Sequence, residues 1–182
     1  MIYFVRHGET DYNLNSIIQG QLDIPLNSTG IKQAEELAIK LKDYQFDKII
    51  SSPLIRASKT AELINKYHNL SIIYDNRIKE YYAGLKQGCK FDSCDIESKS
   101  SVIEAIDNPE EFRAETYMQF YNRVIEFFKE IEKSKENILI VAHGGIYRNI
   151  YRYFNNITDC KEKFLMAKNC EIIAVGKKMS VL

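Results

Sequence analysis

Two histidines, each at the end of a run of apolar residues, are the side chains of this sequence best suited to chemistry. His7 follows the run Ile2–Val5, with Arg6 beside it, and His143 follows the run Ile138–Ala142. A neutral imidazole is a good nucleophile near pH 7, and the planar fork of an arginine binds an oxyanion such as phosphate. A glycine follows each histidine and allows backbone N–H groups to approach an anion. The pattern indicates a phosphate site that contains histidine.

Arg56 and Glu80 stand in similar positions and could complete such a site. Arg56 falls in the first turn of the helix expected after residues 47–51, where free backbone N–H groups and the positive end of the helix dipole favour an anion. Glu80 follows the strand expected at 70–74 and precedes two glycines, a suitable place for a partly desolvated acid. Either residue alone would be an ordinary surface charge, but their positions after strands make them candidate site residues.

Alternating strands and helices are the elements that must position these residues. Short apolar runs predict strands at 2–5, 47–51, 70–74, 138–142 and 170–175, and helical apolar spacing predicts helices near 28–41, 53–64, 117–131 and 146–154. Residues 11–27 show no period and predict a long loop, and Ser52-Pro53 predicts a helix N-cap followed by proline. The expected fold is α/β, a three-layer arrangement with a mostly parallel central sheet and helices on both faces. Ligands bind such sheets at the C-terminal ends of the strands.

Length and charge limit the classes of protein that the chain could belong to. Its 182 residues, 45% of them hydrophobic, predict a single domain over 1–182. The 25 basic residues balance 25 acidic ones, so no global field recruits nucleic acid or an anionic membrane. No signal-peptide pattern opens the chain and no run is long enough to span a membrane, so a cytoplasmic protein is expected. The sequence leaves the oligomeric state open.

The stretches around the two histidines resemble the signature of a known family. Arg6-His7-Gly8-Glu9-Thr10, followed by Asn13, Gln19-Gly20, Asp23, Pro25-Leu26, Gly30 and Gln33-Ala34, resembles that of the histidine phosphatase superfamily, phosphoglycerate-mutase-like branch. Its other motifs are matched by Ser51-Ser52-Pro53-Leu54 with Arg56-Ala57, by Glu80 with Gly84 and Gly88, and by Ala142-His143-Gly144-Gly145 with Arg148. The ordered matches span nearly the whole chain, which argues against coincidence.

The resemblance implies a covalent mechanism that the residue types can also support. His7 would attack phosphorus and form a phosphohistidine, while Arg6, Arg56 and His143 hold the phosphoryl oxygens. Glu80 would protonate the departing alkoxide and then serve as base for the attacking water. Because neighbouring arginines disfavour a charged imidazole, the expected neutral state of His7 is consistent with this role.

The resemblance also assigns substrate-binding positions. Asn13, Gln19, Gly20 and Gly144 would line the site, and the ligand would be a small phosphate monoester. No cofactor is implied. A ribazole phosphate, a sugar or nucleoside monophosphate, phosphoserine and a phosphorylated protein all remain open as substrates.

Metal-dependent hydrolysis is an alternative reading of the same residues. Ligand types are present at His7, Glu9, Asp11, Glu80 and His143. Arg6 and Arg56 argue against it, because fixed cations raise the cost of placing a divalent ion among them. The cysteines, Cys89, Cys94, Cys160 and Cys170, lack C-x-x-C spacing, so free thiols and no zinc site are expected.

A non-catalytic phosphate-binding or interaction module on the same fold is a further alternative, because fold does not fix function. Retention of both histidines, both arginines and the acid weakens it. A binding module would need the arginines alone.

Within the enzyme class, the choice lies between a phosphatase and a phosphoglycerate mutase. Mutases of this family tend to be longer and carry basic residues after the catalytic glutamate, which hold a second acidic group. Here Glu80 is followed by Tyr81, Tyr82 and Ala83, and the segment 86–113, expected to form a small cap, has four basic and seven acidic residues. This charge count predicts a metal-independent phosphomonoesterase.

Overall fold

The central sheet has the architecture expected from the sequence. A computed structural model describes residues 1–90, 101–158, 167–176 and 179–182. Its six-stranded sheet has the order β3-β2-β4-β1-β5-β6. The strands are β1 (Ile2–Arg6), β2 (Lys48–Ser51), β3 (Ile72–Tyr74), β4 (Ile138–Ala142), β5 (Ile172–Val175) and β6 (Ser180–Val181). The first four run parallel, whereas β5 is antiparallel to β1 and β6 to β5.

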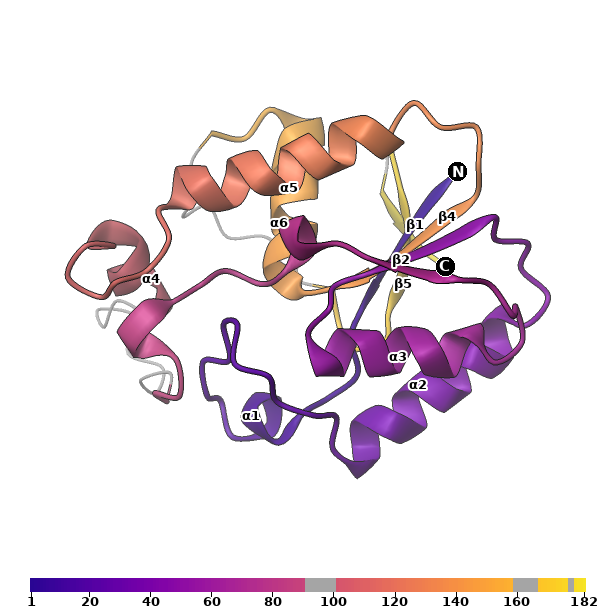
Figure 1. Ribbon diagram of the computed structural model, residues 1–182, viewed down its shortest axis with the longest axis horizontal. Coiled ribbons are helices and arrows are strands. Elements are labelled where there is room, and N and C mark those ends of the chain that lie inside the picture. The colour runs from indigo at the N-terminus through magenta and orange to yellow at the C-terminus, as the bar shows by residue number, and fades with distance from the viewer. Residues whose placement is uncertain (91–100, 159–166, 177–178) are drawn as a thin grey trace.

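Helices cover both faces of this sheet, as Figure 1 shows. α2 (Ser28–Leu41) and α3 (Ile55–Asn65) lie on one face, and α5 (Tyr117–Ile131) and α6 (Gly144–Asn155) lie on the other. Each helix packs an apolar stripe against the sheet. Ile31 stays exposed at the start of α2, and the outer residues of the stripes expected on α5 and α6 are half-buried, namely Tyr117, Tyr121, Ile131, Tyr153 and Phe154. The three-layer α/β prediction is confirmed.

β4 lies at the centre of the sheet, and its side chains contribute to the hydrophobic core on both faces of the sheet. All five of its residues are buried. Ile138, Ile140 and Ala142 pack in the core under α5 and α6, whereas Leu139 and Val141 pack in the core under α2 and α3. Successive side chains of a strand point to opposite faces, so a strand covered on both sides must be apolar throughout.

The parallel strands β1, β2 and β4 end at the same edge of the sheet. Pairing aligns Arg6 with Ala142 on β4 and Ser51 with Val141. The ladder continues for one more residue, because the N–H of His7 donates to Ala142 O and the N–H of Ser52 donates to Val141 O, each at 3.0 Å. The residues that follow these strands are therefore brought together although they are far apart in sequence.

The prediction of a loop over 11–27 is wrong for its first residues, which form the short helix α1 (Asp11–Leu14). The hydroxyl of Thr10 accepts the N–H of Asn13, and Asn13 Oδ1 accepts the N–H of Thr10. This capping box satisfies two backbone donors and stabilises a helix too short to show a period in the sequence.

The predicted N-cap at Ser52-Pro53 is also wrong. The helix α3 begins later, with Leu54 at its N-cap position and no side-chain cap from that residue. Instead, Oδ1 of Asp23 accepts the N–H of Ile55 at 2.6 Å. A residue from the loop after α1 thus caps α3, which ties that loop to the edge of the sheet.

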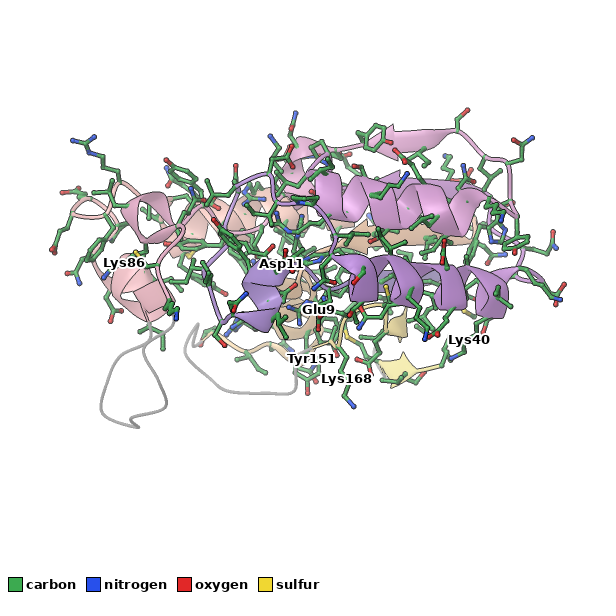
Figure 2. The ribbon with its side chains drawn as sticks, turned by 90° about the horizontal axis from the view of Figure 1, so that it is seen from below. Glu9, Asp11, Lys40, Lys86, Tyr151 and Lys168 are labelled. Carbon is green, nitrogen blue, oxygen red and sulfur yellow. The ribbon has the colours of Figure 1, made fainter. Side chains whose placement is uncertain are left out.

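Three shorter elements complete the described part of the fold, namely η1 (Asn76–Ile78), η2 (Gly84–Lys86) and α4 (Ser101–Asp107). η1 packs against α5, whereas η2 and α4 pack together at one end of the molecule. In Figure 2, Lys86 of this region and Lys40 of α2 lie at opposite ends, with Asp11 between them. Residues 91–100 of the predicted cap lie outside the described residues. The cap and the single-domain boundaries stay predictions.

No helix among the described residues is long and apolar enough to cross a membrane. Cys89 is an exposed free thiol and Cys170 a half-buried one. Cys94 and Cys160 lie outside the described ranges, so the expectation of free thiols stays untested for them.

Candidate active site

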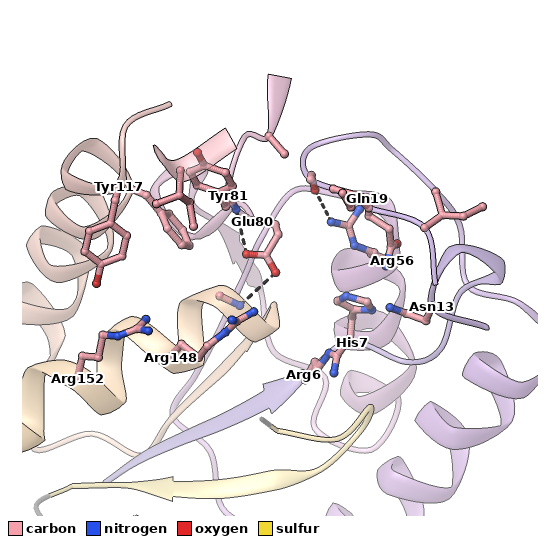
Figure 3. A pocket seen from close by; sticks show the side chains of 17 residues that line it. Arg6, His7, Asn13, Gln19, Arg56, Glu80, Tyr81, Tyr117, Arg148 and Arg152 are labelled. Carbon is pink, nitrogen blue, oxygen red and sulfur yellow. Dashed lines mark hydrogen bonds between the residues drawn. The ribbon is translucent and has the colours of Figure 1, made fainter. Parts of the chain in front are cut away.

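A cavity of about 160 Å³ opens beside the C-terminal end of β1, as Figure 3 shows. It is lined by Arg6 at the end of β1 and His7 after it, Asn13, Gln19 and Gly20 from the following segment, Arg56 of α3, Glu80, Tyr81, Tyr117 of α5, and Gly145, Arg148 and Arg152 of α6. Ile17, Ile18, Ala83, Ile106 and Phe120 supply apolar surface. Segments distant in sequence therefore bring the chemistry-bearing side chains to one small cavity.

His7 is oriented by its own neighbours in the chain. Its Nδ1 lies 2.7 Å from the carbonyl oxygen of Gly8, and because a carbonyl can only accept, Nδ1 must carry the proton. The lone pair is then on Nε2, at the other side of the ring. The backbone is held as well, since Asn169 Nδ2 donates to His7 O at 2.7 Å. His7 thus presents a fixed, unprotonated nitrogen.

Both buried histidines are neutral. Burial, followed by the charges of Arg56 and Arg6, lowers the pKa of His7 well below its usual value, against a smaller opposing effect of the bond to Gly8. Burial likewise lowers the pKa of His143, with Arg56 the next contributor. A neutral imidazole is the form that can attack an electrophile.

Two arginines extend their guanidinium groups beside His7. Arg56 is fully buried and donates to Gly20 O at 2.7 Å and to Leu22 O at 2.8 Å. Arg6 donates to Ala167 O at 3.0 Å. Carbonyl acceptors fix these groups without neutralising them, and neither arginine forms an ion pair with a residue in the described ranges. Their charge is left for an anionic ligand.

The lowered pKa values of Arg6 and Arg56 reflect the electrostatic cost of burying two cations close together. Burial lowers the pKa of Arg6, and it lowers the pKa of Arg56 to about 10. The negative charge of Glu80 opposes the shift in both residues, and Arg6 adds to it at Arg56. An anion bound between the two guanidinium groups would relieve this repulsion and desolvation.

His143 packs against His7 and is not among the described residues that line the cavity. The centroids of the two imidazole rings are 5.2 Å apart. His143 Nε2 lies 2.8 Å from the hydroxyl of Ser52, which also accepts the N–H of Leu54. Ser52 can therefore donate its own proton to Nε2. His143 then carries its proton on Nδ1, a buried atom without a hydrogen-bond partner among the described residues.

The segment after β1 contributes amide groups to the cavity. Oδ1 of Asn13 is occupied by the capping box, and Figure 3 shows the amide nitrogen of Asn13 directed toward His7. Oε1 of Gln19 accepts from the hydroxyl of Thr10 at 3.0 Å, so its donor end is available for a ligand. Gly20 has a positive φ of 51°, and its carbonyl holds Arg56. These residues form the wall opposite Glu80.

Glu80 is held by two backbone donors. Its Oε1 accepts the N–H of Tyr81 at 2.9 Å, and its Oε2 accepts the N–H of Gly145 at 3.1 Å. A Cβ at position 145 would collide with Glu80 Oε1, so the approach requires glycine. The carboxyl group lies between the His7 side of the cavity and the arginines of α6 in Figure 3.

Arg123 of α5 holds the backbone that carries Glu80. Its guanidinium donates to the carbonyls of Arg77, Lys79 and Glu80 at 2.6 to 2.9 Å. It also forms a bidentate pair with Glu115, with donor-acceptor distances of 2.7 and 3.0 Å. Because the pair is largely buried and planar, it fixes the turn after η1 firmly. Nothing in the local sequence pattern of Arg123 identifies this role.

The structure places most of the predicted site residues around one cavity. Gly145 lines it where Gly144 was predicted, because Gly145 is the residue that contacts Glu80. Arg152 and Tyr117 also line the cavity but were not predicted as site residues, and Arg148 had no predicted role there. A signal was available, since residues four apart on a helix share a face, as Arg148 and Arg152 do on α6. In the described residues, no three His, Cys, Asp or Glu side chains converge in a metal-binding arrangement.

Comparison with known proteins places the chain in a family. The family model of the histidine phosphatase superfamily (branch 1) matches residues 2–177. The uncharacterized phosphatase PhoE of Bacillus subtilis is 36% identical over 146 residues, which are 79% of this chain and 72% of PhoE. An Escherichia coli protein named probable phosphoglycerate mutase GpmB is 30% identical over 186 residues, covering 99% of this chain and 86% of GpmB.

A solved structure agrees with these relatives. Mycobacterial glucosyl-3-phosphoglycerate phosphatase, in complex with vanadate (VO3), superposes with a TM-score of 0.78 at 25% identity, over 94% of this chain and 90% of that one. The relatives are thus named phosphatases or mutases. Together with the site geometry, the match over nearly the full length shows that the chain belongs to the histidine phosphatase superfamily, branch 1.

Proposed function

We propose that the protein is a metal-independent phosphomonoesterase that acts on a small phosphorylated metabolite through a phosphohistidine intermediate. The observation that carries the proposal is the state of His7. Its proton is held on Nδ1 by Gly8, its pKa is lowered, and its free Nε2 lies beside two guanidinium groups that have no ion-pair partner among the described residues. This is the arrangement that attack on a phosphate dianion requires.

In the first half of the reaction, His7 Nε2 attacks phosphorus as the ester P–O bond breaks, and an N–P bond forms. Arg6 and Arg56 stabilise the charge that spreads over the phosphoryl oxygens. His143 is not among the described residues that line the cavity, but its ring centroid lies 5.2 Å from that of His7 and its buried Nδ1–H has no partner in the described chain. This N–H would donate to a phosphoryl oxygen held beside His7. Glu80 transfers a proton to the departing alkoxide.

In the second half, water attacks the phosphohistidine in line. Glu80 accepts the proton of this water, the N–P bond breaks, and inorganic phosphate leaves. The fixed position of the carboxyl group, between the N–H groups of Tyr81 and Gly145, suits this exchange of roles. The Nδ1 bond to Gly8 keeps the departing imidazole in its neutral form.

A small substrate is supported by the size of the cavity. Its volume of about 160 Å³ is well below the roughly 300–1,000 Å³ of pockets that hold drug-sized ligands. Arg6 and Arg56 are placed for a single phosphoryl group. A phosphomonoester of a few carbon atoms fits both constraints.

A phosphoglycerate mutase is the second candidate, and a specific observation favours it. The sequence argument against a mutase rests on a shortage of cations beyond Glu80. In the structure, Arg148 and Arg152 supply such cations from α6 and not from the cap. The charge count in the cap therefore does not separate the two activities. The phosphatase proposal rests on the relatives named phosphatases and on the absence of basic residues at Tyr81, Tyr82 and Ala83.

One experiment separates the two activities. The enzyme is incubated with 3-phosphoglycerate, with and without 2,3-bisphosphoglycerate, and products are followed by ³¹P NMR. We expect inorganic phosphate to accumulate at a rate independent of the bisphosphate. Formation of 2-phosphoglycerate faster than phosphate release would assign a mutase.

The covalent and metal-free parts of the proposal have their own test. Turnover stopped with alkali should leave a phosphohistidine peptide containing His7, because this linkage survives base, and mass spectrometry detects it. EDTA should leave activity unchanged and vanadate should inhibit. Loss of activity on EDTA treatment, restored by zinc or magnesium, would support the metal-dependent alternative.

A further inference from the structure

The cavity extends beyond Glu80 to a second group of cations on α6. Arg148 and Arg152 both line it, four residues apart and so on one face of the helix. Tyr117 of α5 faces them, as Figure 3 shows. None of these residues takes part in the proposed chemistry at phosphorus, so their presence in the cavity requires a separate explanation.

Arg148 is a half-buried cation without a hydrogen-bond or ion-pair partner among the described residues. Its Nε is buried without a hydrogen-bond acceptor, and its side chain forms no hydrogen bond or ion pair within the described part of the chain. Burial lowers the pKa of Arg148, and the largest opposing effect comes from the charge of Glu80. Glu80, however, gives both its oxygens to backbone N–H groups and forms no ion pair with Arg148. A buried guanidinium in this state favours an anionic ligand.

Arg152 and Tyr117 are held in place around this position. The Arg152 side chain is 4% exposed, and its guanidinium carbon lies 5.7 Å from the centroid of the Tyr117 ring. The hydroxyl of Tyr117 donates to Asn149 Oδ1 at 3.3 Å. A cation over an aromatic face and a tethered ring form a preorganised wall and not a pair of mobile surface chains.

Position separates this group from the phosphate end of the cavity. After burial, the charges of Arg56 and Arg6 lower the pKa of His7, and Arg148 is not among the contributing charges. Arg148 does act on Arg6, whose pKa it lowers less than burial does, so the two groups of cations are adjacent parts of one cavity. Glu80, the proposed proton donor to the leaving group, lies between the two groups in Figure 3. Atoms that contact Arg148 therefore belong to the leaving group of the substrate.

We propose that Arg148 and Arg152 form a second anion subsite, and that the substrate is a small phosphomonoester with a carboxylate on its leaving group. The proposal rests on the phosphomonoesterase activity proposed above. A carboxylate matches the planar guanidinium of Arg148 in shape and in charge. Because the cavity is small and both groups of cations line it, the phosphoryl group and the carboxylate must belong to the same substrate molecule. The apolar surface of Ile18 and Phe120 fits a short carbon chain that joins them.

Two pairs of substrates that differ only in the carboxylate test this subsite. One pair is 3-phosphoglycerate and glycerol 3-phosphate, and the other is O-phosphoserine and phosphoethanolamine. We expect kcat/KM to be at least about 30-fold higher for the carboxylate-bearing member of one pair or of both. A ratio of this size is what one charge pair in a desolvated site contributes to binding. Arg148→Gln should lower this ratio to near one. Arg148→Lys, which keeps the charge, should restore part of it.

Control variants separate binding from indirect effects. Arg152→Gln should reduce the ratio less than Arg148→Gln, while Lys129→Gln, which removes an exposed cation from α5, should leave it unchanged. If Arg148 acted only through the position or charge of Glu80, Arg148→Gln would slow both members of a pair equally. That result, or a ratio near one in the unaltered enzyme, overturns the subsite.

Failure of the subsite can be told from failure of the proposed activity. Hydrolysis of p-nitrophenyl phosphate and glycerol 3-phosphate that depends on His7, with a ratio near one in both pairs, would leave the phosphatase intact and exclude the subsite. If no ester is hydrolysed, calorimetric titration of 3-phosphoglycerate and glycerol 3-phosphate into His7→Ala protein still decides it. Equal Kd values would exclude the subsite, and tighter binding of 3-phosphoglycerate that is lost in His7→Ala/Arg148→Gln would support it.

Discussion

The two ends of the cavity are built in different ways. The proposed phosphate end is formed by residues at the end of β1 and at the start of α3, and Arg6, His7 and Arg56 are each fixed by a carbonyl acceptor. The leaving-group end is formed by helix faces and by the turn after η1, where Arg148 has no fixed partner in the described chain and Glu80 depends on Arg123 for its backbone position.

This contrast indicates how one site can keep the same reaction at phosphorus while its selectivity for the leaving group changes. Strand ends are positioned by the sheet, so the groups that contact the phosphoryl unit cannot change without changing the core. Helix-face residues can be exchanged with less disturbance of the core. We therefore infer that the phosphate end defines the reaction and the leaving-group end defines the substrate, and the following predictions test this division.

The largest effect is expected at the phosphate end. His7→Ala should reduce phosphate release by at least ~10³-fold for every ester, because no nitrogen remains to form the covalent intermediate. The measurement is steady-state release from alkyl and aryl esters, with circular dichroism to show that the variant is folded. His68→Ala is the matched control, since His68 packs on Phe46 away from the cavity. Near-normal turnover in folded His7→Ala protein would refute the nucleophilic role.

Glu80→Gln should slow the hydrolysis of different substrates to different extents, according to the basicity of their leaving groups. Proton donation matters most when the leaving alkoxide is basic, so alkyl phosphates should slow by about 10²- to 10³-fold and aryl phosphates with good leaving groups much less. The measurement is kcat for a series of esters of graded leaving-group acidity. Equal losses across the series would show that Glu80 only positions the substrate, and the two ends would then not differ in the way proposed.

Arg123→Gln should reproduce a weaker form of the Glu80 effect. Without the guanidinium, three carbonyls of the turn lose their donor and Glu80 loses its fixed position. We expect kcat for alkyl esters to fall about 10-fold with little change in KM, a loss within the range for misplaced catalytic groups.

Arg77→Gln is the control for Arg123→Gln. Arg77 forms ion pairs with Asp75 and Glu130 on the same side of the molecule, but its side chain does not contact the Glu80 backbone. A loss of equal size in both variants, or equal losses on alkyl and aryl esters, would show a general effect on stability.

The smallest expected effect is on the pH dependence of stability, and it comes from the two buried histidines at the phosphate end. The folded pKa of His7 and of His143 is below the unfolded value of 6.5, so the unfolded chain binds more protons as pH falls below that value. Stability present above pH 6.5 is therefore lost below it, by about 1.4 kcal/mol per pH unit for each histidine at most.

Urea unfolding at pH 7.5 and 5.5 measures this loss. The double variant His7→Asn/His143→Asn should lose less stability between the two pH values than the unaltered protein. His68, whose pKa burial also lowers, contributes equally to both proteins. The same pH dependence in both proteins would contradict the assignment of neutral, buried histidines.

The positions of Arg6, His7 and Arg56 in the fold are predictable from the sequence, because each lies at the end of a recognisable strand or at the start of a recognisable helix. An apolar run fixes where β1 and β4 end, and parallel pairing then brings Arg6 and Ala142 into register. No long-range detail is needed to bring His7 and His143 close together. The fold class is predictable for the same reason, since a run apolar throughout must be covered on both faces.

The leaving-group end depends on packing that local patterns do not encode. Arg123 is one of many polar residues on α5, and only the approach of the turn after η1 gives it three carbonyl acceptors. The missed cap of α3 has the same origin, because Asp23 reaches Ile55 from a different segment. Side chains that act across such distances are defined by the folded structure and not by their neighbours in sequence.

The contacts between the start of the chain and residues 167–173 have a consequence for biosynthesis. Arg6 donates to Ala167 O, Cys170 donates to Arg6 O, and Asn169 donates to His7 O. A chain emerging from the ribosome exposes His7 early, yet it cannot complete the support of that residue until the segment before β5 has been made. The proposed nucleophile therefore lacks part of its backbone support until β5 has been made and pairs antiparallel with β1, so the proposed activity depends on a segment that is translated long after His7.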